Sequence, residues 1–235
     1  MLPMGLQAFL KWRLMIPDQF AAMQHMGQCG FRPRVVLDIG AYVGKFAKMT
    51  RSVWPDARIV MFEPQPDKQA MLQALATRLG NTTLMPSLLG ERAGVKVQFH
   101  LHESGSSMKT FKSDEGTRTI ELTTTTLDES VAGTPFEQPD LIKIDVQGAE
   151  KEVIAGGMRC LGRAQAVILE VPIVEEYEGA PLFHDVVAFM AAQGFRVYDL
   201  CTIWRNSRNK SMIEADLIFA RPQCPIFDPK NYWEH

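Results

Sequence analysis

The fold is decided by one stretch, Val35-Val36-Leu37-Asp38-Ile39-Gly40-Ala41-Tyr42-Val43-Gly44. It begins as an apolar run of β-favouring residues and passes through two glycines four positions apart into apolar residues at helical spacing. This pattern predicts a buried strand that turns sharply into a helix. Glycine lets the backbone turn tightly and approach a ligand closely, and a helix start offers unpaired N–H groups. The stretch therefore indicates a nucleotide-handling turn.

An acid at the end of the next strand narrows the choice of ligand. The apolar run 58–62 ends at Glu63, 23 residues beyond Gly40, where a carboxylate can accept hydrogen bonds from both hydroxyls of an adenosine ribose. NAD and S-adenosylmethionine both carry that ribose. The dinucleotide pattern G-x-G-x-x-G is broken here, because Ala41 follows the first glycine and Tyr42 stands in the third place. The turn therefore favours S-adenosylmethionine.

The charge beside the turn favours the same cofactor. Asp38 precedes the first glycine, where it would repel a pyrophosphate but suit the ammonium group of a methionine moiety. The residues predicted to bind the cofactor in this region are Asp38, Gly40, Ala41, Gly44 and Glu63. An NAD-dependent oxidoreductase is the less favoured alternative.

Four motifs follow one another along the chain: the turn at 38–44, Phe62-Glu63-Pro64, Thr126-Leu127-Asp128 and Lys143-Ile144-Asp145-Val146-Gln147-Gly148-Ala149-Glu150. With them the chain resembles the FkbM family of S-adenosylmethionine-dependent methyltransferases, from about residue 35 to residue 220. The resemblance implies a class I methyltransferase fold and methyl transfer to oxygen, typically a hydroxyl of a sugar or natural-product scaffold. One departure is Gln147, which replaces the usual acid and removes a charge beside the presumed acceptor site.

Two acids are the candidate catalytic residues. An ordinary sugar alcohol is a poor nucleophile at neutral pH, so we expect either a general base or a divalent metal such as magnesium that lowers the pKa of the alcohol. Asp145 and Glu170 each end a predicted strand on the ligand side of the sheet. Asp145 could instead cap the helix that opens at Gly148. Glu150 and His184 are reserve candidates, and the sequence identifies no metal ligands.

The remaining apolar runs predict an α/β fold of the class I methyltransferase (Rossmann-like) type, with a mostly parallel seven-stranded sheet and helices on both faces. After the first two strands, further strands are predicted at 83–85, 139–145, 164–170, 195–200 and 213–219, the last two as a hairpin. Helices are predicted at 66–79, 148–156 and 182–193.

An insertion between the third and fourth strands has a different pattern. Residues 95–101 and 119–123 alternate apolar and polar side chains, which predicts an inserted β-hairpin or an added sheet edge. The small polar loop 104–108 between them can approach a ligand. Just before the insertion, Ser87 and Leu88 lie where class I methyltransferases hold the adenine ring, so they are candidate cofactor contacts. A plain connection is the alternative.

The two ends of the chain are predicted to flank a single catalytic domain. Apolar residues at helical spacing in 6–14 and 20–26 predict an N-terminal helical extension, 1–33, before a methyltransferase domain, 34–222, and a C-terminal tail, 223–235. We expect these helices to cover the core, with a membrane or acceptor contact by Lys11, Trp12 and Arg13 as the alternative. The loop 203–212 carries Trp204 and three basic residues, which either contact a substrate or solvate a hairpin tip.

The composition limits the partners. With 235 residues and 46% hydrophobic side chains, the chain suits one domain. A net charge of −2 argues against nucleic acid. The four cysteines form no C-x-x-C pair, which is typical of a reducing compartment. Because no run reaches the roughly 18 apolar residues that cross a bilayer and no secretory signal pattern is present, we expect a cytoplasmic protein without stable membrane insertion.

The expected partner is a small-molecule hydroxyl acceptor, a saccharide or a secondary metabolite. A cofactor-binding module of the same fold that has lost transferase activity is a further alternative, indicated only by Gln147.

Overall fold

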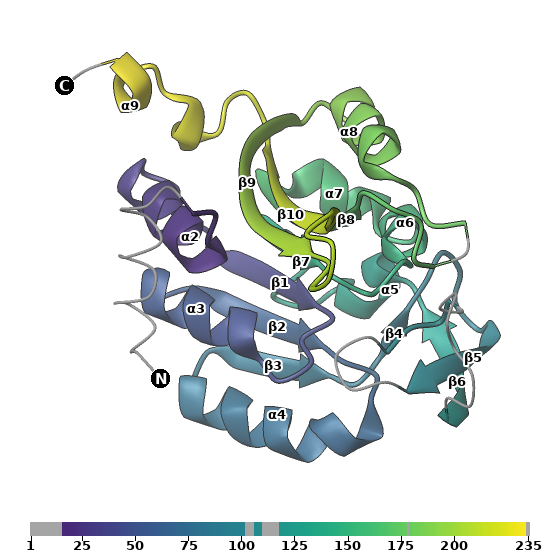
Figure 1. Ribbon diagram of the computed structural model, residues 1–235. Coiled ribbons are helices and arrows are strands. Elements are labelled where there is room, and N and C mark those ends of the chain that lie inside the picture. The colour runs from purple at the N-terminus through teal and green to yellow at the C-terminus, as the bar shows by residue number, and fades with distance from the viewer. Residues whose placement is uncertain (1–15, 102–105, 110–117, 178, 234–235) are drawn as a thin grey trace.

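The structure is a computed structural model and describes residues 16–101, 106–109, 118–177 and 179–233. Its centre is a seven-stranded sheet in the order β3-β2-β1-β7-β8-β10-β9 (Figure 1). In that order the strands are Thr82–Met85, Arg58–Phe62, Val35–Ile39, Leu141–Ile144, Ala166–Pro172, Met212–Ala220 and Arg196–Arg205. The first five are parallel, and β10 is antiparallel to both of its neighbours. The predicted mostly parallel seven-stranded sheet is confirmed.

Helices cover both faces of this sheet, as predicted, because the central strands are apolar on both sides. One layer consists of α2 (Gln19–Gln28), α3 (Lys45–Val53) and α4 (Pro66–Leu79). The other consists of α5 (Leu127–Val131), α6 (Glu150–Ala155), α7 (Met158–Arg163) and α8 (Phe183–Ala192). The alternation of side chains along β1 divides the core: Val36 packs in the first layer, and Leu37 and Ile39 pack in the second.

A second, smaller sheet lies beyond the carboxyl ends of β1, β2 and β3 (Figure 1). It contains β4 (Leu88–Leu89), β6 (Arg118–Thr125) and β5 (Lys96–Leu101), in that order. The two predicted strands of the insertion pair antiparallel, with Lys96 opposite Thr123 and Leu101 opposite Arg118. They form a hairpin in a separate sheet, so the alternative of an added edge on the main sheet is wrong. The predicted loop residues 104 and 105 lie outside the described part of the chain.

The segment predicted as an N-terminal extension is packed into the main core over its described part. Asp18 caps α2 by accepting a 3.0 Å hydrogen bond from the backbone N–H of Ala21. Met23 and Met26 of α2 are fully buried in the cluster that also covers β1. The predicted second helix is thus confirmed, whereas the predicted first helix and Lys11, Trp12 and Arg13 lie outside the described residues.

The chain after β10 also returns to this core. Two short helices follow, η1 (Pro225–Phe227) and α9 (Lys230–Trp233). Ile226 is fully buried in the same cluster as α2. None of the helices in the described ranges is long and apolar enough to cross a membrane.

Candidate active site

A cavity of about 790 Å³ opens at the carboxyl ends of the parallel strands, where open α/β sheets bind their ligands. Its size is within the usual range for small-molecule sites. Seven of the nine predicted site residues line it: Gly40, Ala41, Glu63, Ser87, Leu88, Asp145 and Glu170. Asp38 and Gly44 are not among the lining residues. The structure therefore brings most of the predicted site together around one space.

The turn after β1 is shaped by packing against the rest of the protein. Gly40 has a left-handed φ of +77°, and a Cβ atom there would overlap the backbone carbonyl oxygen of Asp145. The N–H groups of Gly40 and Ala41 both donate to the carbonyl of Phe62 at 3.0 Å. Gly40 is therefore required by the close approach of the segment after β7, in addition to any space needed by a cofactor.

The second glycine of the motif has a similar structural role. Gly44 precedes α3 with a φ of +69°, and a Cβ atom there would overlap the side chain of Leu75 on α4. The glycine thus allows α3 and α4 to pack closely. The sequence motif predicted a cofactor contact for Gly44, and that contact remains a prediction beside the packing role.

Glu63 lies in the cavity wall with only 3% of its surface exposed. Its Oε2 accepts a 2.7 Å hydrogen bond from the backbone N–H of Tyr42, and its Oε1 accepts one of 3.0 Å from Gln65. Burial raises the pKa of Glu63, although these two hydrogen bonds oppose the rise. A carboxylate has about four acceptor positions, so each oxygen can accept another hydrogen bond.

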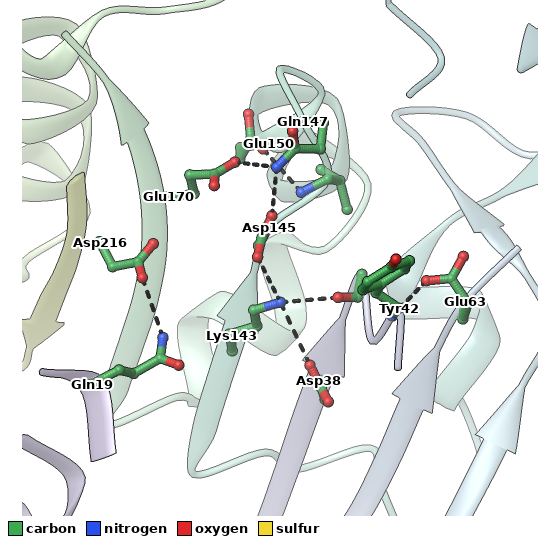
Figure 2. Close-up of polar contacts among 12 residues, drawn as sticks. Gln19, Asp38, Tyr42, Glu63, Lys143, Asp145, Gln147, Glu150, Glu170 and Asp216 are labelled. Atoms are coloured by element: carbon green, nitrogen blue, oxygen red, sulfur yellow. Dashed lines mark hydrogen bonds and ion pairs between the residues drawn. The ribbon is translucent and has the colours of Figure 1, made fainter. Parts of the chain in front are cut away.

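Lys143, which was not predicted as a site residue, joins three parts of the site (Figure 2). Its Nζ donates a 2.9 Å hydrogen bond to the carbonyl of Gly40 and lies 3.1 Å from Asp145 Oδ2 and 3.7 Å from Asp38 Oδ1. The charges of Asp145 and Asp38 raise the pKa of Lys143 in spite of its burial. A lysine in the otherwise apolar strand Leu141–Ile144 was the available signal.

Asp38 is fully buried beneath the turn. Burial raises its pKa to about 6, although Lys143 opposes the rise. Neither carboxylate oxygen has a hydrogen-bond partner among the described residues, so the ion pair with Lys143 is its main compensation. Its predicted contact with a cofactor remains a prediction.

Gln147 bridges the two predicted catalytic acids (Figure 2). Its Nε2 donates hydrogen bonds of 2.9 Å to Asp145 Oδ1 and 2.7 Å to Glu170 Oε2. Its Oε1 accepts a 3.0 Å hydrogen bond from the hydroxyl of Tyr177. We call Asp145 and Glu170, joined in this way, the carboxylate pair. The residue that departs from the family pattern therefore holds the pair together.

The two members of the carboxylate pair differ in proton affinity. Burial alone would raise the pKa of Asp145, but Lys143 and Gln147 outweigh it and lower that pKa. Burial and the negative charge of Asp145 raise the pKa of Glu170 well above its usual value. Such a divergence between neighbouring acids is the usual means of giving them different roles in acid–base chemistry.

The alternative role for Asp145 as a helix cap is wrong. Helix α6 begins after Ala149 without a side-chain cap, and the Asp145 carboxylate contacts Lys143 and Gln147 instead. The loop between β7 and α6 is held by Glu150 instead. Its Oε1 accepts hydrogen bonds from the N–H groups of Val146 at 3.0 Å and Gly148 at 3.2 Å.

The reserve catalytic candidates lie away from the cavity. Glu150 is buried and used by the loop, and His184 is exposed on α8 beside Asp185. Neither lines the cavity. Within the described ranges, no three or more His, Cys, Asp or Glu side chains are grouped so that they could hold a metal ion. The four cysteines are free and buried.

The strand order and the cavity at the strand ends define a class I methyltransferase fold. The crystal structure of methyltransferase FkbM from Methylobacillus flagellatus KT has this fold, with a TM-score of 0.53 and 14% sequence identity over 78% of this chain and 43% of that chain. The Methyltransferase FkbM domain matches residues 38–197, and the chain belongs to this family.

Two relatives are similar in sequence. The 2-O-methyltransferase NoeI of Sinorhizobium fredii (strain NBRC 101917 / NGR234) is 29% identical over 161 residues, which cover 62% of this chain and 66% of NoeI. The hexuronic acid methyltransferase AglP of Haloferax volcanii is 27% identical over 137 residues, which cover 58% of this chain and 55% of AglP. The chain thus matches these relatives over two thirds of their length or less.

Proposed function

We propose that this chain is an S-adenosylmethionine-dependent O-methyltransferase that acts on a hydroxyl of a sugar or a natural-product-like small molecule. The observation that carries the proposal is one cavity with a glycine turn and Glu63 on one side and the carboxylate pair on the other. Membership of the FkbM family supports the reaction. The names of the two relatives, a 2-O-methyltransferase and a hexuronic acid methyltransferase, support a saccharide acceptor.

The residues of the turn fit the methyl donor. The buried Glu63 carboxylate keeps acceptor capacity on both oxygens for the ribose hydroxyls. Gly40 and Ala41 would present backbone to the donor, and Ser87 and Leu88 would lie at its adenine ring. The predicted contacts of Asp38 and Gly44 with the donor remain predictions, and both residues also shape the turn, Asp38 through Lys143 and Gly44 through the start of α3. When bound, S-adenosylmethionine supplies an electrophilic methyl group on a cationic sulfonium.

The carboxylate pair would remove the acceptor proton. Glu170 would accept the hydroxyl proton of the acceptor as the acceptor oxygen becomes methylated. Asp145 stays ionised because Lys143 and Gln147 stabilise its charge. Its negative charge in turn raises the proton affinity of Glu170. This assignment gives the proton to Glu170 and the supporting charge to Asp145, and it takes the general base from the two expected alternatives, a general base or a divalent metal.

A divalent metal fits these residues less well than a base. The Gln147 amide nitrogen lies between Asp145 and Glu170, at hydrogen-bond distance from both. A cation that bridged the two carboxylates would have to displace it. The proposed mechanism therefore uses Glu170 as the base and no metal ion.

The proposed partner and location rest on the net charge, the cavity lining and the cysteines. We propose a small hydroxylated acceptor over nucleic acid because the formal net charge is −2 and the cavity is lined by several carboxylates. A cytoplasmic location remains a prediction from cysteine usage.

The proposal is tested by binding and transfer measured on the same protein. Calorimetry should show binding of S-adenosylhomocysteine and none of NAD. Incubation with radiolabelled S-adenosylmethionine and a panel of sugars should then label at least one hydroxyl acceptor. NAD binding would support the oxidoreductase alternative. S-adenosylhomocysteine binding without transfer to any acceptor in the panel would favour the module that has lost transferase activity.

A further inference from the structure

The outer wall of the cavity contains groups that the proposed methyl transfer does not use. It is formed by the start of α2 and by β9 and β10, which contribute Gln19, Trp204, Glu214 and Asp216. Gln19 Nε2 donates to Asp216 Oδ2 at 3.5 Å (Figure 2). We call Trp204, Glu214 and Asp216 the outer wall residues.

The strand register places acidic side chains in a row on one face of the sheet. Asp216 of β10 lies directly opposite Glu170 of β8 and opposite Thr202 of β9. Residues directly opposite one another point to the same face, as do residues two apart on a strand. Glu214 therefore lies on the face of Asp216, and Trp204 lies opposite Glu214. The row of side chains on this face therefore runs from Glu170 of the carboxylate pair through Asp216 and Glu214 to Trp204.

This arrangement is electrostatically unfavourable without a cation. Like charges directly opposite each other destabilise a sheet. Burial and Asp145 raise the pKa of Asp216 to about 6, and burial and Glu176 lead the rise of the Glu214 pKa to about 7. Among the described lining residues, six are acidic, namely Asp18, Glu63, Asp145, Glu170, Glu214 and Asp216. Two are basic, Lys45 and Lys143, and Lys143 is held by its own ion pairs.

The positive charge of the methyl donor would reach only the Glu170 end of this wall, because the transferred methyl must contact the acceptor oxygen whose proton Glu170 takes. The donor would lie at the turn after β1, whereas β10 is three strands away in the order β1-β7-β8-β10. Neighbouring strands are about 4.8 Å apart, so the separation is about 14 Å. Lys143 and Lys45 already offset part of the charge of Asp216, whereas the main influences on Glu214 are burial and other acids, so a cation of the acceptor would chiefly offset the charge of Glu214.

Trp204 supplies the apolar part of the same wall. Its side chain lines the cavity although 58% of the residue is exposed, and Ile16, which is 47% exposed, lines the same cavity. An indole offers a flat apolar face for a sugar ring, and the same face attracts cations. With Glu214 opposite Trp204 in the register, an ammonium group can contact both.

We infer that the acceptor is a pyranose with a protonated amino group, which packs on Trp204 and places its ammonium between Glu214 and Asp216. The inference rests on the proposed function, since it assigns the acceptor of that site. A neutral sugar can still donate hydroxyl hydrogen bonds to these carboxylates, but it leaves their repulsion in place. A uronic acid adds a further negative charge. The outer wall residues therefore select amino sugar over neutral sugar, and neutral sugar over uronic acid.

The test is a comparison of binding among three matched probes. Protein saturated with S-adenosylhomocysteine is titrated at pH 7 with the methyl glycosides of glucosamine, glucose and glucuronic acid, and dissociation constants are measured by ligand-observed NMR. We expect the glucosaminide to bind about tenfold more tightly than the glucuronide, with the glucoside between them. A ratio below fivefold, or no measurable glucosaminide binding, overturns the inference.

Variants of the outer wall residues test whether these side chains cause the preference for the glucosaminide. Asp216→Asn and Glu214→Gln should each reduce the glucosaminide to glucuronide ratio while leaving glucoside binding nearly unchanged, whereas Trp204→Ala should weaken all three probes, the glucosaminide most, because only its ammonium also contacts the indole face. Asp56→Asn is the matched control, because Asp56 is exposed, precedes the amino end of β2 and does not line the cavity, which opens at the carboxyl ends of the strands. Unchanged affinity for S-adenosylhomocysteine shows that each variant is folded. An undiminished ratio in both acidic variants overturns the inference.

Methyl transfer measured on the same probes separates this inference from the proposed function. The expected probe order without transfer to any acceptor supports the charge preference and contradicts the methyltransferase proposal. Transfer to the glucuronide with a higher kcat/KM than to the glucosaminide supports the proposed function and overturns the inference.

Discussion

The ammonium group of Lys143 donates a 2.9 Å hydrogen bond to the carbonyl of Gly40. A residue of β7 thus holds the turn that follows β1, the neighbouring strand in the sheet. The same ammonium lies between the carboxylates of Asp38 and Asp145 (Figure 2). One buried lysine thus links Asp38 beneath the turn, the turn itself and the carboxylate pair.

Replacing this lysine should destabilise the fold. Lys143→Met leaves the fully buried Asp38 without its ion-pair partner, and breaking a buried pair costs about 3 to 5 kcal/mol. The free energy of unfolding, measured by urea denaturation, should fall by that amount. The double variant Asp38→Asn with Lys143→Met should be more stable than Lys143→Met alone, since it removes the uncompensated charge. An unchanged urea midpoint for Lys143→Met would show that the ion pair contributes nothing.

The structure also changes what a substitution at Gly40 should do. In Gly40→Ala the new Cβ overlaps the carbonyl oxygen of Asp145 at a left-handed φ, so we expect a loss of about 3 kcal/mol or more from overpacking and backbone strain together. Gly133→Ala is the matched control, because Gly133 also has a positive φ, +67°, but open space around its Cβ position. That variant should lose about 1 to 2 kcal/mol. Equal thermal stability of the two variants would contradict the packing argument.

Glu63 should contribute to cofactor affinity through the ribose. Glu63→Ala removes charge-assisted hydrogen bonds worth roughly 1.5 to 3 kcal/mol, so S-adenosylhomocysteine should bind at least about tenfold more weakly. The loss could also come from the turn, because Glu63 holds the N–H of Tyr42. A 2′,3′-dideoxy analogue separates the two: the parent should prefer the natural ligand, and Glu63→Ala should bind both alike. An affinity within about threefold of the parent would make the ribose assignment wrong.

Stability should depend on pH through Glu150. Burial raises its pKa from the model-compound value of 4.5 to about 7, so the folded state binds this proton more tightly than the unfolded state does. The stability that it contributes is fully present below about pH 4.5 and is lost as the pH rises through about 7. The lost contribution amounts to at most about 3 kcal/mol.

Glu150→Gln isolates this contribution. Both loop hydrogen bonds go to Glu150 Oε1, and a glutamine carbonyl can accept them without titrating. The variant should match the parent near pH 5 and exceed it in free energy of unfolding at pH 8. Glu129→Gln, at an exposed residue of α5, is the control. Parallel stability curves for parent and Glu150→Gln would exclude Glu150 as the source.

The fold could be predicted largely from sequence because its strands are short apolar runs that end in glycines or acids. The main-sheet strand β2 was predicted with its observed bounds, and β1 was predicted, as observed, in the apolar run just before Gly40. Five described elements were not predicted, namely β4, α5, α7, η1 and α9, and the reason is physical for two of them. β4 has two residues and exists through its pairing with β6, and α7 follows Gly156 and Gly157, which look like a helix end in sequence.

The site was predicted less completely, because a sequence does not show which way side chains point. Asp38 and Gly44 belong to the motif but lie beside the cavity rather than on its surface. Lys143 acts through contacts with strands distant in sequence. In the sequence, Gln147 was visible only as the absence of an acidic charge. Its role as a bridge depends on the hydrogen bond to Glu170, 23 residues later.

The assignment of the proton to Glu170 gives the most informative prediction about catalysis. Positioned bases contribute typically 10²- to 10⁴-fold to rate, so Glu170→Gln should reduce kcat by about that factor while S-adenosylhomocysteine affinity stays unchanged. Asp145→Asn should act differently. It removes the negative charge that raises the pKa of Glu170, so Glu170 loses its proton at lower pH and the acidic limb of the pH–rate profile should move to lower pH. Chelators should leave both profiles unchanged. Full turnover by Glu170→Gln together with a 10²-fold or greater loss in Asp145→Asn would return the role of base to Asp145, and activity lost on chelation and restored by magnesium would replace the base by a metal ion.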